Sequence, residues 1–104
     1  MAIATIEKNG NTLTVCPEGR LDTIRTPLLD NELKPHLEGV SQIIMDFSDL
    51  EYVSSSGLRL LLWLEQKMED LGGDVQVINA NQTVLKIFEM AGFMAVLNVI
   101  TDCP

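Results

Sequence analysis

At the centre of the chain stands Asp46-Phe47-Ser48-Asp49-Leu50-Glu51-Tyr52-Val53-Ser54-Ser55-Ser56-Gly57-Leu58, which follows an apolar triplet, residues 43–45, and precedes leucines at helical spacing. This order predicts a strand, a polar loop and the start of a helix. Three consecutive serines fall at the helix entrance, where backbone N–H groups lack partners and the helix dipole is positive. Hydroxyl groups there can cap the helix, accept a phosphoryl group, or do both.

The residues before this stretch predict a hairpin and a first helix. Apolar and polar side chains alternate over residues 2–8 and 12–16, with Asn9-Gly10 between them, which is a strong hairpin signal. Thr26 followed by Pro27 predicts a helix that Thr26 caps and Pro27 begins. The apolar stripe of this predicted helix comprises Leu28, Leu29, Leu33 and Leu37. Pro35 predicts a kink or an early stop of the helix, and Gly39 marks its end.

The rest of the chain predicts three more strands and two more helices. Residues 43–45 are continuously apolar, so we expect the strand over residues 40–47 to be covered on both faces. The other predicted elements are a long helix from residue 55 or 56 to 71 closed by Gly72-Gly73, a strand over 74–79, a helix that Asn81 caps and Gly92 stops, and a closing strand over 96–100.

These elements predict a single α/β domain over residues 1–104, in which an N-terminal β-hairpin leads into a mixed, mostly parallel sheet with crossover helices. In such sheets the functional crevice lies beyond the carboxyl ends of the parallel strands. The loops expected there are residues 21–26, 48–56 and 79–82. We therefore expect one sheet edge to gather Asp22, Ser54, Ser55, Ser56, Asn79 and Asn81.

Charge and composition narrow the class of partner. Seven basic against fifteen acidic residues give a net charge of −8, which disfavours nucleic acids and anionic membrane surfaces as partners. The N-terminal residues resemble no signal peptide and no apolar run is long enough to cross a bilayer, so a cytoplasmic protein without membrane insertion is expected. Cys16 is then expected to be a reduced, buried thiol and Cys103 a tail thiol.

The sequence does not favour catalysis. The only histidine, His36, falls in the first predicted helix, away from the serines, so a catalytic triad is not expected. No glycine-rich nucleotide-binding loop is present, and one histidine with two distant cysteines offers no metal site. We predict a protein that is not an enzyme and that uses no cofactor. Trp63 is expected to be core or half-buried packing.

Several motifs resemble the STAS family of bacterial anti-sigma factor antagonists. Ser54-Ser55-Ser56-Gly57-Leu58 is similar to the family's Asp-Ser-Ser-Gly-Leu, with Ser54 in place of the aspartate. Gly19-Arg20-Leu21-Asp22 and Phe88-Glu89-Met90-Ala91-Gly92-Phe93 extend the resemblance along nearly the whole chain. The resemblance implies that a partner kinase phosphorylates Ser55, with Ser54 or Ser56 as substitutes, and that Asp22 belongs to the rim around the acceptor. The partner-binding residues that we predict are Asp22, Thr23, Ser54, Ser56, Gly57, Arg59 and Asn81. Arg59, one turn into the helix, is either an ordinary solvated residue or a contact to a partner's carboxylate.

Two functions follow from these observations. In the first, as the resemblance implies, the unphosphorylated protein binds an anti-sigma factor serine kinase and thereby releases a sigma factor, until phosphorylation of Ser55 breaks the complex and a phosphatase restores it. In the second, the protein is a constitutive STAS scaffold or transporter-associated subunit, and the serines only cap the helix. Ser54 in place of the family's aspartate motivates this second reading.

Overall fold

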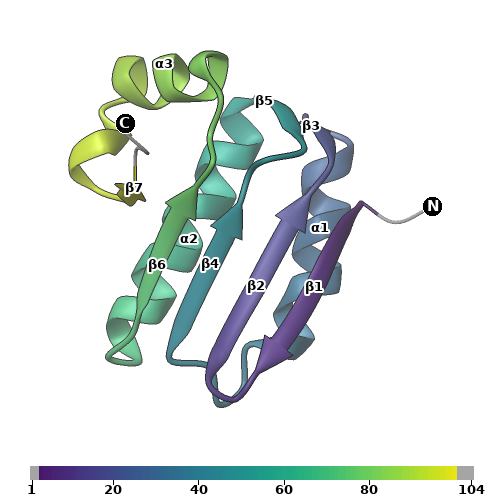
Figure 1. The fold of residues 1–104 in the computed structure, drawn as a ribbon, viewed down its shortest axis with the longest axis vertical. Coiled ribbons are helices and arrows are strands. Elements are labelled where there is room, and N and C mark those ends of the chain that lie inside the picture. Colours follow the sequence, from purple (N-terminus) through teal and green to yellow (C-terminus); the bar gives the residue numbers. More distant parts are fainter. Residues whose placement is uncertain (1–2, 101–104) are drawn as a thin grey trace.

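A computed structural model describes residues 3–100 and confirms the predicted α/β class. Figure 1 shows the elements in the order of the chain. The strands are β1 (Ala4–Asn9), β2 (Thr12–Pro17), β3 (Gly19–Leu21), β4 (Gln42–Asp46), β5 (Leu50–Val53), β6 (Asp74–Ile78) and β7 (Asn98–Ile100). The helices are α1 (Arg25–Leu33), α2 (Ser55–Asp70) and α3 (Gln82–Ala91), with short 3-10 turns η1 (Lys34–His36) and η2 (Phe93–Ala95).

The main sheet has the strand order β1-β2-β4-β6-β7. Strands β1 and β2 form the predicted antiparallel hairpin, and the tight turn between them places Gly10 at φ +62°, a conformation that glycine adopts without strain. Strands β2, β4, β6 and β7 are parallel, so their carboxyl ends meet at one end of the sheet. The predicted mixed, mostly parallel sheet is therefore confirmed.

The two faces of this sheet differ, which corrects the expectation that β4 is covered on both. Helices α1 and α2 lie together behind the sheet, and no helix formed by residues 3–100 covers the front face (Figure 1). Accordingly Ile43 and Met45 point into the core and are fully buried, whereas Ile44 between them is only half-buried. Ile44 lies on the open face of the sheet among mostly polar neighbours, although it is itself apolar. Because of this one residue the run 43–45 is continuously apolar, which is the pattern of a strand buried on both faces.

A second, two-stranded parallel sheet lies beyond the carboxyl ends of the main one, where a loop was expected. Strand β3 pairs with β5, and the pair lies at the upper end of α1 and α2 (Figure 1). Arg20 pairs with Tyr52 across the two strands, and its guanidinium lies 4.5 Å from the centre of the Tyr52 ring. The prediction that residues 48–56 form only a loop was wrong.

The start of the first helix also differs from the prediction. Helix α1 begins at Arg25, and Thr26 lies inside it with a buried hydroxyl, so Thr26 is not its cap. Other helix ends were predicted correctly: α1 gives way to the 3-10 turn that contains Pro35, Asn81 caps α3, and Gly92 ends α3 in the left-handed conformation. Of the two cysteines, Cys16 is half-buried and faces the open side of the sheet, and Cys103 lies outside the described residues.

The core fills the space between the sheet and the helices. Its fully buried large side chains include Phe47, which directly follows β4, Phe88 of α3 and Met68 of α2. None of the helices in residues 3–100 is both long and apolar enough to span a membrane.

Candidate functional site

Ser54 is the cap of α2 and ties it to the small sheet. Its Oγ accepts a hydrogen bond from the Gly57 backbone N–H at 3.5 Å, and its backbone is extended, as an N-cap requires. The same hydroxyl donates to the backbone oxygen of Leu21 at 2.7 Å, and the Ser54 N–H donates to that oxygen at 2.8 Å. An ionised aspartate could not make the side-chain bond to Leu21, because a carboxylate only accepts hydrogen bonds. The serine at position 54 therefore has a structural role of its own.

Ser55 and Ser56 follow in the first turn of α2 with different surroundings. Ser55 is exposed, and its hydroxyl makes no hydrogen bond to the rest of residues 3–100. Ser56 is half-buried and lines a groove between α1 and α2. The Ser55 hydroxyl is thus presented to solvent, whereas the Ser54 hydroxyl is engaged in hydrogen bonds.

Gly57 is required by the close approach of α2 to β3 and β5. A Cβ atom at this position would lie 2.7 Å from Cγ1 of Val53 and 3.1 Å from Cβ of Leu21. Both neighbours are almost completely buried, so neither has free space to move into. The first turn of α2, with Ser55 and Ser56, is therefore held tightly against the small sheet.

Asp22 caps α1 in place of the expected Thr26. Its Oδ1 accepts hydrogen bonds from the backbone N–H groups of Arg25 at 2.8 Å and Ile24 at 3.0 Å. The bond from the Arg25 N–H is the main cause that lowers the pKa of Asp22 below its usual 3.8. Thr23, which follows, is exposed, so Asp22 and Thr23 form the turn that leads from β3 into α1.

This cap gives a pH-dependent prediction. A lowered pKa in the folded state means that the Asp22 carboxylate stabilises the fold above pH 3.8 and that this contribution is lost as the pH falls through the folded-state pKa. Asp22→Asn keeps an acceptor oxygen but removes the charge. We expect the urea midpoint of wild type to exceed that of the variant at pH 7, and the gap to close on acidification. A gap that is the same at every pH would contradict this.

Asn81 and Asn79 lie at the opposite end of β5 from the serines. Asn81 caps α3 by accepting a hydrogen bond from the Val84 N–H at 2.8 Å, and its side-chain amide donates to the Leu50 backbone oxygen at 3.1 Å. Asn79, at φ +59°, donates from its side-chain amide to Oδ1 of Asp46 at 3.1 Å. Since Leu50 begins β5 and Ser54 follows it, these asparagines and the serines are separated by the length of that strand, about 13 Å.

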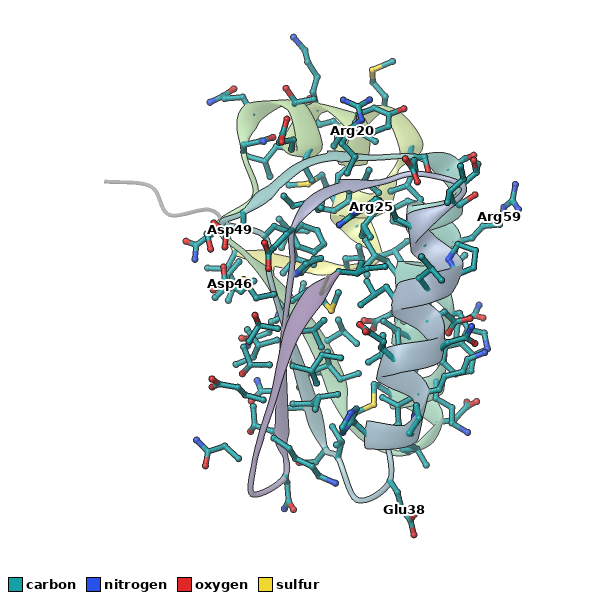
Figure 2. The ribbon with its side chains drawn as sticks, turned by 90° about the vertical axis from the view of Figure 1, so that its right-hand side faces the viewer. Arg20, Arg25, Glu38, Asp46, Asp49 and Arg59 are labelled. Carbon is teal, nitrogen blue, oxygen red and sulfur yellow. The ribbon has the colours of Figure 1, made fainter. Side chains whose placement is uncertain are left out.

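The residues that we expected together at one edge of the sheet therefore lie on two different sides of the molecule. Figure 2 shows Asp46 and Asp49 on the open-sheet side and Arg59 on the helix side. Asp22 and the three serines belong to the helix side, and the two asparagines bond to the elements of the other side. Asp22 lies near Ser54, because the Ser54 hydroxyl donates to the backbone oxygen of Leu21, the residue before Asp22. Asn81 does not lie beside the serines.

The open-sheet side carries a small acidic group beside Cys16. Burial raises the pKa of the Cys16 thiol, and the nearby carboxylates of Asp46 and Asp49 raise it further. Burial would also raise the pKa of Asp46, but hydrogen bonds from Asn79 and Ser48 outweigh it and the pKa is lowered. Within residues 3–100, no group of three or more His, Cys, Asp and Glu side chains is placed to hold a metal ion.

A groove between α1 and α2 was not predicted from the sequence. Its volume is about 320 Å³, and it opens beside the serines. Trp63, which is 39% exposed, forms part of its wall, and Nζ of Lys34 lies 4.7 Å from the centre of the Trp63 ring. The groove is lined by Thr26, Pro27, Asp30, Lys34, Ser56, Arg59, Leu60 and Trp63. The only signal in the sequence is that Ser56, Arg59 and Trp63 share one face of α2.

Comparison with known proteins supports this description. The family model for the STAS domain matches residues 4–102. BtrV of Bordetella bronchiseptica, described as a candidate anti-sigma factor antagonist, is 26% identical over 96 residues, which cover 91% of this chain and 83% of BtrV. The unphosphorylated form of the anti-sigma factor antagonist SpoIIAA superposes with a TM-score of 0.81 at 24% identity, covering 95% and 89% of the two chains. The phosphorylated form of SpoIIAA, from Bacillus, gives a TM-score of 0.73 at 22% identity, with coverages of 95% and 92%.

Proposed function

The chain belongs to the STAS domain family, and from this premise we propose that it is an anti-sigma factor antagonist whose protein binding is switched by phosphorylation of Ser55. The unmodified chain would bind an anti-sigma factor kinase, and the phosphorylated chain would not. A phosphatase would reverse the modification. The protein would act by binding and would carry no catalytic site of its own.

The observation that supports this proposal most is the setting of Ser55. Its hydroxyl is exposed at the first turn of α2, while Ser54 and Gly57 fix that turn against β3 and β5. A phosphate would add about −1.5 to −2 charges there. Negative charge at a helix N-terminus favours the helix. The modification would therefore change what the surface can bind and leave the fold in place.

The test is phosphorylation by purified anti-sigma factor kinases of the source organism. With ATP, one of them should phosphorylate wild type, Ser54→Ala and Ser56→Ala, but not Ser55→Ala, as read by mass spectrometry of the intact chain and its peptides. The same kinase should bind the unmodified chain and Ser55→Ala, and should bind the phosphorylated chain at least tenfold more weakly. Absence of phosphate from all of residues 54–56 would contradict the proposal.

A second candidate function is a constitutive scaffold. It is favoured by Ser54, whose hydroxyl is engaged by Leu21 and Gly57 in a purely structural arrangement. A scaffold predicts that Ser55→Ala and Ser55→Asp bind the same partner with equal affinity. The switch predicts that only Ser55→Asp weakens binding, so the two variants decide between the functions.

A further inference from the structure

The groove between α1 and α2 carries an uncompensated positive charge in an otherwise acidic chain. Three charged residues line it. Lys34 is paired with Asp30 at 3.2 Å, and this is the only ion pair among residues 3–100. Arg59 is exposed and has no carboxylate within ion-pair distance in that part of the chain. Figure 2 shows its side chain projecting outward from α2, far from Asp46 and Asp49.

Arg59 is the exposed, unpaired cation of this groove within residues 3–100. Oγ1 of Thr26 and Oδ1 of Asp30 also make no hydrogen bond within residues 3–100, but both atoms are buried and out of reach of a binding partner. A guanidinium pairs with a carboxylate through charge-assisted hydrogen bonds. Leu60 and Trp63 add apolar wall to the groove, against which the methylene groups of an acidic side chain can pack. The occupant that matches Arg59 and this apolar wall is an aspartate or glutamate of a partner protein.

Arg59 is also placed to interact with residue 55. Both belong to α2, four positions apart, and residues at this spacing are neighbours on a helix surface, about 5–6 Å apart at Cβ. Arg59 and Ser56 both line the groove, so the groove reaches the residue next to the proposed site of phosphorylation. One guanidinium is thus within reach of both a phosphate at Ser55 and an acidic side chain in the groove.

We infer that Arg59 transmits the switch: it binds a carboxylate of the partner in the α1–α2 groove when Ser55 is unmodified, and it pairs with the phosphate when Ser55 is phosphorylated. The phosphate then removes the guanidinium from the partner and adds negative charge beside the partner's acidic group. Both effects weaken the complex. This inference rests on the proposed function.

The pairing of Arg59 with phosphate can be tested without any partner. The chain is produced with phosphoserine incorporated at position 55 during translation, and the second ionisation of the phosphate, near pH 6 in the absence of pairing, is followed by phosphorus NMR. Arg59→Gln should raise this pKa by about half a unit, because it removes a cation that favours the dianion. Arg59→Lys should restore part of the shift.

Lys67→Gln is the matched control. Lys67 is an exposed base of α2, twelve positions from Ser55, which is about 18 Å along the helix axis and more than twice the screening length at physiological salt. Its replacement should leave the phosphate pKa within about a tenth of a unit. Equal shifts in Arg59→Gln and Lys67→Gln, or no shift in either, would overturn the pairing.

The binding of Arg59 to a carboxylate of the partner is tested with the kinase identified by the phosphorylation experiment. Arg59→Gln should weaken its binding to the unmodified chain about tenfold, and Lys67→Gln less than twofold. Phosphorylation should then reduce the affinity of Arg59→Gln by a smaller factor than that of wild type. If phosphorylation reduced the affinity of wild type and of Arg59→Gln by equal factors, the inference that Arg59 pairs with both the partner and the phosphate would be overturned. If no kinase binds, the proposed function fails, and the NMR titration still decides whether Arg59 pairs with the phosphate.

Discussion

Replacing Phe88 by alanine is expected to lower the free energy of unfolding by about 3–5 kcal/mol. Phe88 is fully buried, and its ring centre lies 6.3 Å from those of both Phe47 and Phe93. Truncation would remove the side chain that joins α3 to the end of β4 and would leave a cavity where it stood. The surrounding backbone belongs to a sheet and a capped helix, so little collapse can fill that cavity.

Urea unfolding followed by circular dichroism measures this effect. Met90→Ala provides the control, because Met90 is on the same helix, is of similar bulk and is 84% exposed. It should change the free energy of unfolding by less than about 0.5 kcal/mol. If Phe88→Ala lost no more stability than Met90→Ala, α3 would not be packed as described.

Gly57→Ala is expected to be destabilising by about 1–3 kcal/mol even though alanine is the better helix former. The new methyl group would lie 2.7 Å from Cγ1 of Val53 and 3.3 Å from the backbone oxygen of Leu21. That oxygen also accepts both hydrogen bonds of Ser54, so any shift that relieves the contact strains the cap of α2. The first turn of α2 should become less ordered as a result.

Ser56→Ala tests the same turn without the clash. Ser56 is half-buried and lies one residue earlier, and alanine there should keep or slightly raise the stability. Amide hydrogen exchange of residues 55–60 should be faster in Gly57→Ala than in wild type and unchanged in Ser56→Ala. A Gly57→Ala protein as stable as wild type would show that α2 does not require this close approach.

Much of the fold could be predicted because local signals agreed with the final structure. Asn9-Gly10 marked the hairpin, Asn81 and Gly92 bounded α3, and the leucine spacing identified α2. Strands β3 and β5 were missed because they span only three and four residues and are stabilised by pairing with each other, far apart in sequence. The cap of α1 was misassigned because a nearby carboxylate, Asp22, competed with Thr26 for the same role.

The candidate site was predictable in its residues more than in its geometry. The serine triplet indicated a helix entrance, and Ser54 does cap α2. The sequence could not show that β5 separates Asn81 from the serines, because that separation depends on strand pairing. Nor could it show the groove, because its walls come from two helices whose lateral packing no local pattern encodes.

The position of Lys34 above Trp63 makes the groove optically observable. Trp63 is the only tryptophan of the chain, so its emission comes from this one place. A cation above an indole ring alters the electrostatic field that the excited ring experiences. Any side chain that enters the groove and displaces the Lys34 ammonium group should therefore shift the emission spectrum, so the unlabelled protein carries its own reporter of occupancy.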